Sequence, residues 1–92
     1  MIHIRRLRWD DWNIAQIGHH GVIPEEAEEV CHGDFFLLQG KQRRIILIGP
    51  TNRGRILAVV LEHEGEGDYY PVTARPASRK EREWYRDMKK GV

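Results

Sequence analysis

The chain has 92 residues, with 15 Lys and Arg against 14 Asp and Glu, and its formal net charge is +1. A chain this short builds one compact core, so we expect a single domain spanning residues 1–92. The near-neutral charge excludes a general attraction to nucleic acid, and any such binding must depend on local groups of charge.

The cysteine content and the hydropathy pattern bear on the compartment. Cys31 is the single cysteine in the sequence, so no disulfide can form within the chain and we expect a reducing compartment. No apolar stretch approaches the length of a membrane span or of a signal peptide. We therefore expect a cytoplasmic protein without a membrane partner.

The first third of the chain predicts one strand and two helices. The strand covers residues 2–9, and a helix follows that is capped by Asp10 or Asp11 and runs through Ile17. A second helix begins at Pro24, because proline suits the first helical position. The apolar face of this second helix comprises Ala27, Val30 and Cys31.

Four strands follow without an intervening helix. Apolar runs predict strands over residues 34–39, 43–48 and 55–61, and the last of these is almost wholly apolar, as in a strand covered on both faces. A glycine-rich turn then leads to a strand that starts at Tyr69. The predicted order is β-α-α-β-β-β-β-α, an α+β domain with an antiparallel meander.

The last strand turns directly into a C-terminal helix. Pro76 ends the strand, since proline donates no hydrogen bond to a sheet. Ser78 and Glu81 have the spacing of a capping box, in which each side chain bonds the backbone N–H of the other residue. The positions that recur at helical spacing are Ala77, Glu81, Trp84, Tyr85 and Met88.

Charge is distributed unevenly along the chain. Residues 75–90 carry seven cations and three anions, whereas residues 24–34 carry five anions and no Lys or Arg. Cations at the start of the last helix oppose its dipole, which favours anions there. Either water screens this cost or a phosphate offsets it.

Four blocks of residues resemble a known family when they are taken together. They are Trp9-Asp10 with Asn13, His20-Gly21-Val22, Gly54-Arg55, and Ala74-Arg75 followed by Ala77-Ser78 and Glu81. In order and spacing, the chain resembles the BrnT family of bacterial toxins, small ribonucleases with a RelE-like fold. The resemblance runs from Arg6 to about Arg86.

The resemblance implies a RelE-like fold with two N-terminal helices and one C-terminal helix. It also implies metal-independent RNA cleavage with no other cofactor. The implied partner is a cognate antitoxin, typically with a ribbon-helix-helix domain, and DNA would be contacted only through the toxin–antitoxin complex.

Cleavage of RNA by its own 2′-hydroxyl needs an acid, a base and cations that stabilise the phosphorane charge. The catalytic candidates are His20, Arg44 and Arg75. The candidates for RNA or phosphate binding are Arg55, Arg79, Arg82 and His19.

Each candidate also has a structural interpretation. His20 can end a helix, and the alternative for Arg75 is an ion pair with Glu81 or another acidic residue. The spacing of His19, His20, His32 and Cys31 does not match a zinc site, so we expect no metal. A module that binds RNA or antitoxin without cutting, and an interaction protein without a nucleic-acid role, remain as alternatives.

Overall fold

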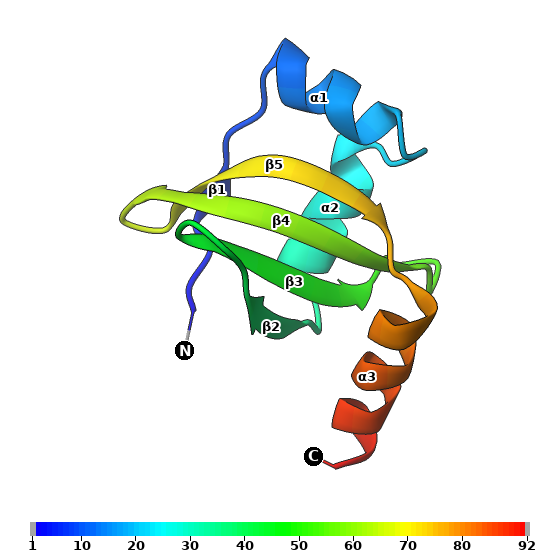
Figure 1. Ribbon diagram of the computed structural model, residues 1–92. Coiled ribbons are helices and arrows are strands. Elements are labelled where there is room, and N and C mark those ends of the chain that lie inside the picture. The colour runs from blue at the N-terminus through cyan, green and yellow to red at the C-terminus, as the bar shows by residue number, and fades with distance from the viewer. Residues whose placement is uncertain (1, 92) are drawn as a thin grey trace.

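The computed structural model describes residues 2–91 and has the predicted α+β fold (Figure 1). The elements are β1 (Arg6–Leu7), α1 (Asp11–Gly18), α2 (Pro24–Cys31), β2 (Phe36–Gln39), β3 (Arg44–Pro50), β4 (Ile56–Gly65), β5 (Asp68–Pro76) and α3 (Arg79–Lys90). One sheet has the strand order β1-β5-β4-β3-β2. Strands β2 to β5 form an antiparallel meander, and β1 pairs parallel with β5.

Strand β4 lies at the centre of the sheet and is buried on both faces, as its apolar sequence predicts. Leu57, Val59 and Leu61 face a core formed with α1 and α2. Ala58 faces the other side, where it packs with Ile48 and with Tyr85 of α3. Helices therefore cover the two faces separately, and α3 leaves the sheet at the end of β5 (Figure 1).

The two N-terminal helices begin where the sequence predicts. The Asp10 carboxylate accepts a hydrogen bond of 2.8 Å from the Asn13 N–H and caps α1. Pro24 is the first residue of α2, and the Glu26 carboxylate accepts from the Ile23 N–H at 3.2 Å. No helix within residues 2–91 is long and apolar enough to cross a membrane.

The predicted strand boundaries needed correction at several places. The strand expected over residues 2–9 is reduced to Arg6–Leu7, because only these residues pair with the start of β5. The strand expected from residue 43 begins at Arg44, since Arg43 has a φ of 67° and belongs to the turn. The strand expected over residues 34–39 begins at Phe36, and β4 continues to Gly65.

The turn between β2 and β3 generates a testable prediction. Gln42 and Arg43 both have positive φ, 55° and 67°, as the central pair of a type I′ turn requires. Side chains with a Cβ atom disfavour this region, at a cost of about 1–2 kcal/mol per residue. Changing the pair to Asn-Gly is expected to raise the free energy of unfolding by about 1 kcal/mol, measured by urea titration with an unchanged slope. A lower midpoint in urea would contradict the turn geometry.

Candidate functional site at the end of the sheet

Arg75 lies where β5 ends and is held by the first turn of α3. Its Nη1 and Nη2 atoms donate to the two carboxylate oxygens of Glu81 at 2.6 and 2.9 Å. The same carboxylate accepts from the Ser78 N–H at 2.8 Å, and the Ser78 hydroxyl accepts from the Glu81 N–H at 3.2 Å. The predicted capping box is therefore confirmed, and it also fixes the guanidinium.

This arrangement has electrostatic and geometric consequences. The hydrogen bonds from Arg75, with those from Ser78, lower the pKa of Glu81 from 4.5 to about 2, although partial burial opposes the change. Glu81 occupies only the outer end of the Arg75 fork. Within residues 2–91, Nε donates no hydrogen bond, so the Nε–Nη2 edge can still bind a phosphate in bidentate fashion.

Arg55 is the second cation at this end of the sheet. Its Nη1 donates to the Gly21 carbonyl at 3.0 Å and to the Glu26 carboxylate at 3.2 and 3.3 Å. Arg55 therefore links the start of β4 to the loop that carries His20. Both histidines of this loop, His19 and His20, are exposed, and neither ring has a hydrogen bond among the described residues.

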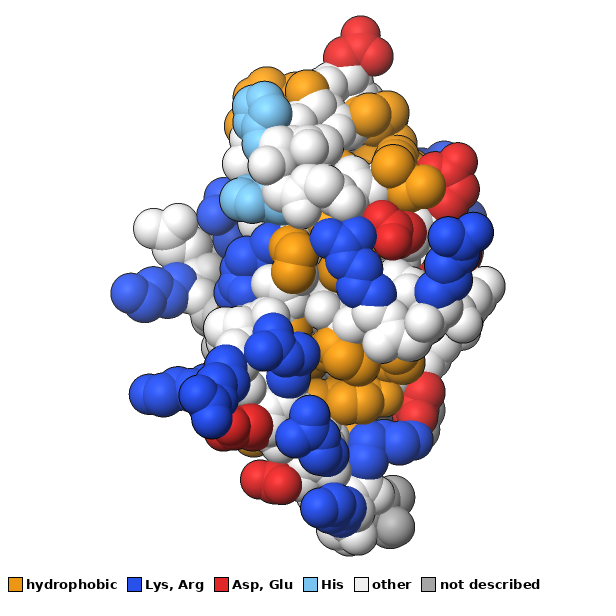
Figure 2. Space-filling model, turned by 90° about the vertical axis from the view of Figure 1, so that its right-hand side faces the viewer, with side chains coloured by type: hydrophobic (Ala, Val, Ile, Leu, Met, Phe, Trp, Pro, Cys, Tyr) orange, Lys and Arg blue, Asp and Glu red, His pale blue; other side chains and the backbone are white. Residues whose placement is uncertain are grey.

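Arg55 and Arg75 lie on opposite faces of the sheet. Arg75 pairs with Ala58 in register, on the face that α3 covers, whereas Arg55 reaches Glu26 of α2 on the other face. Figure 2 shows the molecule from this end: histidine side chains lie in the upper part, and Lys and Arg side chains gather in the middle and over α3. The end of the sheet is thus a basic surface flanked by histidine.

Arg44 lies away from this surface. It begins β3, where it pairs in register with Glu62 and contacts the Glu62 carboxylate at 3.5 Å. The site end of β3 is Pro50, six residues further along the strand, which corresponds to roughly 20 Å. The structure therefore does not bring Arg44 together with His20 and Arg75.

The two candidate cations of α3 differ in their contacts. The Nε atom of Arg79 contacts Glu83 at 3.3 Å, one turn along the helix, and its side chain is 86% exposed. The Nη1 atom of Arg82 donates to the Ala77 carbonyl at 2.7 Å, so this side chain folds back over the corner. Arg79 and Arg82 therefore both lie in the first turns of α3, next to the end of β5 that carries Arg75.

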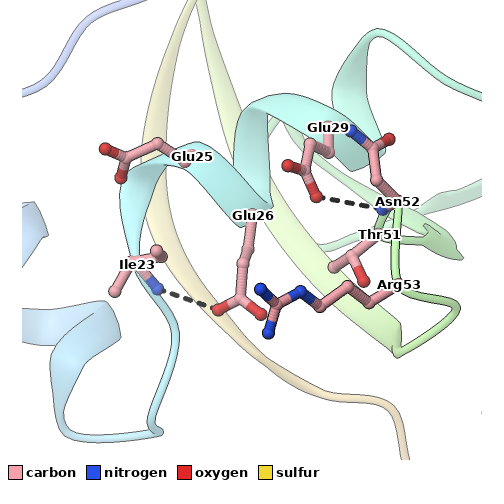
Figure 3. A pocket seen from close by; sticks show the side chains of 7 residues that line it. All are labelled: Ile23, Glu25, Glu26, Glu29, Thr51, Asn52 and Arg53. Atoms are coloured by element: carbon pink, nitrogen blue, oxygen red, sulfur yellow. Dashed lines mark hydrogen bonds between the residues drawn. The ribbon is translucent and has the colours of Figure 1, made fainter.

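A hollow of about 450 Å³ lies between α2 and the loop that joins β3 to β4 (Figure 3). It is lined by Ile23, Glu25, Glu26, Glu29, Thr51, Asn52 and Arg53. Three carboxylates repel a phosphate, so the hollow itself does not suit RNA. The phosphate-binding potential lies on the cationic surface next to it.

Arg53 is a cation that the sequence candidates omitted. It lies in the loop between β3 and β4 and is exposed, and its side chain extends along the hollow toward Glu26 (Figure 3). The signal was present in the sequence, because an Arg between Asn52 and Gly54 in a strand-connecting turn lies at the tip of that turn.

The residues considered for zinc are not arranged as ligands. Cys31 is buried, and burial raises the pKa of its thiol. His19, His20 and His32 are exposed. Within residues 2–91, no group of three or more His, Cys, Asp or Glu side chains has the arrangement of a metal site.

Two residues of the first block, Trp9 and Asn13, have structural contacts. Trp9 packs against the core and donates from Nε1 to Glu28 at 2.9 Å. Asn13 is buried and donates to the Arg8 carbonyl at 3.0 Å. Trp12, in contrast, is 60% exposed. The Trp-Asp block therefore serves to start α1 and attach it to the core.

Comparison with known proteins supports the fold. No family model matches the sequence, and no curated protein sequence matches it. Among solved structures, the chain is similar to the 1.1 Å crystal structure of the Brucella abortus ribonuclease toxin BrnT. The TM-score is 0.66 at 23% sequence identity, and the match covers 80% of this chain and 97% of that chain. The similarity confirms the BrnT-like fold that the sequence predicts.

The Arg75–Glu81 pair predicts how stability depends on pH. Because folding lowers the pKa of Glu81 to about 2, its contribution is complete above pH 4.5 and is lost as the pH falls toward 2. Glu81→Gln is expected to cost about 1–3 kcal/mol at neutral pH through the weakened cap and ion pair. Urea titrations of both proteins across this pH range are expected to converge at the acidic end.

Glu83→Gln is the matched control on the same helix. It removes an exposed pair between residues four apart, which contributes about 0.2–0.5 kcal/mol. A difference between wild type and Glu81→Gln that stays constant from neutral pH to pH 2 would contradict the lowered pKa.

Proposed function

We propose that this protein is an endoribonuclease toxin of a type II toxin–antitoxin system that cleaves RNA without a metal ion. The similarity to a ribonuclease toxin over 97% of that chain carries the proposal. Cations lie on both faces at one end of the sheet and support it: Arg55 contacts the loop of His20 on one face, and Arg75 lies with Arg79 and Arg82 of α3 on the other.

The proposed reaction is an attack of the 2′-hydroxyl oxygen on the adjacent phosphorus. The hydroxyl loses its proton to a base, a bond forms between the 2′-oxygen and phosphorus, and the bond to the 5′-oxygen breaks. The departing 5′-oxygen takes up a proton, which leaves a 2′,3′-cyclic phosphate and a 5′-hydroxyl end. Negative charge develops on the phosphoryl oxygens, so fixed cations stabilise the transition state.

Arg75 is proposed to bind the reacting phosphate through its Nε–Nη2 edge while Glu81 holds the other end of the fork. A fixed guanidinium needs little reorganisation as charge develops. His20 is proposed as the acid or base, since an imidazole can donate or accept a proton and this side chain is exposed, next to Gly21, whose carbonyl accepts from Arg55. Arg55 and His19 are proposed to contact flanking phosphates.

The proposed partners follow from the toxin class. A cognate antitoxin, of the ribbon-helix-helix type, would neutralise the toxin, and DNA would be contacted only through the complex of the two proteins. Residues 1–92 are proposed to act as one domain in this complex.

A second candidate function is favoured by one observation: Arg44, Arg55 and Arg75 each contact a carboxylate of this chain. Such pairing lowers the positive potential available to a transition state. The alternative is a module on the same fold that binds RNA or an antitoxin and does not cut. It is distinguished by retention of RNA without any cleavage product.

Incubation of purified protein with labelled single-stranded RNA, with and without EDTA, tests the proposal. We expect cleavage that survives EDTA and a fall in kcat/KM of about 100-fold or more in Arg75→Ala, as for the loss of one charge-stabilising donor. Arg43→Gly, which removes an exposed cation at the far end of β3, is the control and is expected to retain activity. RNA that stays intact while bound would favour the second candidate.

His20→Ala tests the acid–base assignment separately. Proton transfer by a positioned side chain contributes about 10²–10⁴-fold, so kcat is expected to fall by at least 100-fold. The remaining activity should depend less on pH than that of wild type, because one proton-transfer group is lost. An unchanged kcat and pH profile would remove His20 from the mechanism and leave the role of Arg75 untouched.

A further inference from the structure

One side of α3 carries a regular row of cations. Arg79, Arg82, Arg86 and Lys90 are spaced three, four and four residues apart, so they lie along one stripe of the helix. Tyr85 and Glu81 lie on the opposite side and attach α3 to the sheet and to Arg75. We name the four cations the α3 strip.

The α3 strip is exposed and mostly not neutralised. Its four side chains are exposed, and within residues 2–91 Arg79 is the one member with an ion pair, to the Glu83 carboxylate at 3.3 Å. Within residues 2–91, neither Arg86 nor Lys90 has a side-chain hydrogen bond or an ion pair. Helix α3 as a whole carries six cations and three anions, a net charge of +3, and Lys and Arg side chains gather over α3 in Figure 2.

The strip continues from the candidate site. Arg79 is the first residue of α3 and follows Arg75 by four residues, and the strip then runs about 16 Å along the helix. The strip lies on the side of α3 away from Glu81, so a strand bound at Arg75 would reach it by passing over the first turn of the helix at Arg79.

We propose that the α3 strip binds the phosphate backbone of single-stranded RNA on one side of the cleaved bond. The inference rests on the proposed function and extends it, because these cations would contact flanking phosphates and not the reacting one. Binding would depend on charge and be independent of base sequence.

RNA fits this strip better than an acidic protein surface does. Protein interfaces depend on apolar or aromatic anchors that are buried at their centre. The side chains of the strip are all charged, and Trp84 and Tyr85 pack toward the sheet with Phe36. A row of cations without an apolar anchor is suited to a flexible polyanion.

Fluorescence anisotropy with a labelled 2′-O-methyl single-stranded RNA, titrated at several salt concentrations, tests the strip. The 2′-O-methyl group prevents cleavage, so binding is measured alone. In Arg86→Ala/Lys90→Ala the slope of log K against log salt is expected to fall by about 1.4, or about 0.7 for each lost phosphate contact. Arg86→Lys/Lys90→Arg keeps both charges and should keep the slope.

A matched control removes two cations elsewhere. Lys41→Ala/Arg43→Gly changes the turn at the opposite end of β3 and is expected to leave the slope unchanged. Circular dichroism and thermal unfolding establish that each variant is folded. The cleavage assay with unmodified RNA is carried out in parallel, and the Ala pair should raise KM while kcat at saturating RNA stays the same.

The outcomes separate the two proposals. If wild type cleaves RNA but the Ala pair binds with an unchanged salt slope, the strip is wrong and the nuclease proposal stands. If wild type binds without cleaving and the Ala pair lowers the slope, the strip is right and the nuclease proposal is wrong. If labelled polyglutamate binds in place of RNA and the Ala pair abolishes that binding, the strip is a protein-binding surface and the inference is overturned.

Discussion

The Glu81 carboxylate determines how the last strand and the last helix meet. It holds Arg75 at the end of β5, accepts the Ser78 N–H and thereby fixes the direction in which α3 leaves the sheet. The Glu81 anion also interacts favourably with the helix dipole. This interaction offsets the unfavourable one between the dipole and the cations Arg79 and Arg82. The positions of the basic side chains along α3 depend on this contact together with two others: Tyr85 packs against the sheet and donates to the Asp34 carbonyl, and Lys89 pairs with the Asp34 carboxylate.

The opposite face of the sheet repeats this arrangement with different residues. Glu26 of α2 holds Arg55, as Glu81 of α3 holds Arg75. A paired Arg loses part of its positive potential but gains a fixed orientation, and a guanidinium has enough donors to hold a carboxylate and a phosphate at once. The paired cations thus hold a guanidinium in a fixed orientation. The exposed cations, Arg53 and Arg86 among them, contribute positive potential that attracts anions.

Local patterns predicted most of the elements, because the relevant forces act over a few residues. The Ser78–Glu81 capping box, Pro24 at the start of α2 and the apolar run of β4 each define an element without distant contacts. The strand predicted over residues 2–9 was too long, because its true length depends on pairing with a distant segment of the chain. Ile4 is buried as an inward strand residue would be, yet pairing depends on how far β5 extends beside it, and the register includes only Arg6 and Leu7.

Which candidate residues lie near one another depends on the register between the strands, and local sequence patterns do not determine that register. The sequence predicted a strand over residues 43–48 and offered Arg44, on that strand, as a catalytic candidate with His20 and Arg75. The turn takes Arg43 out of the strand, and the pairing of Arg44 with Glu62 fixes it at the far end of β3. Arg55 and Arg75 lie at the same end of the sheet, on its two faces, because the start of β4 lies beside the end of β5, where Leu57 pairs with Pro76. A shift of one residue in register moves every side chain of a strand to the other face of the sheet. Residue type therefore predicted which cations could bind a phosphate. Only the pairing between strands determined which of these cations lie at the same end of the sheet.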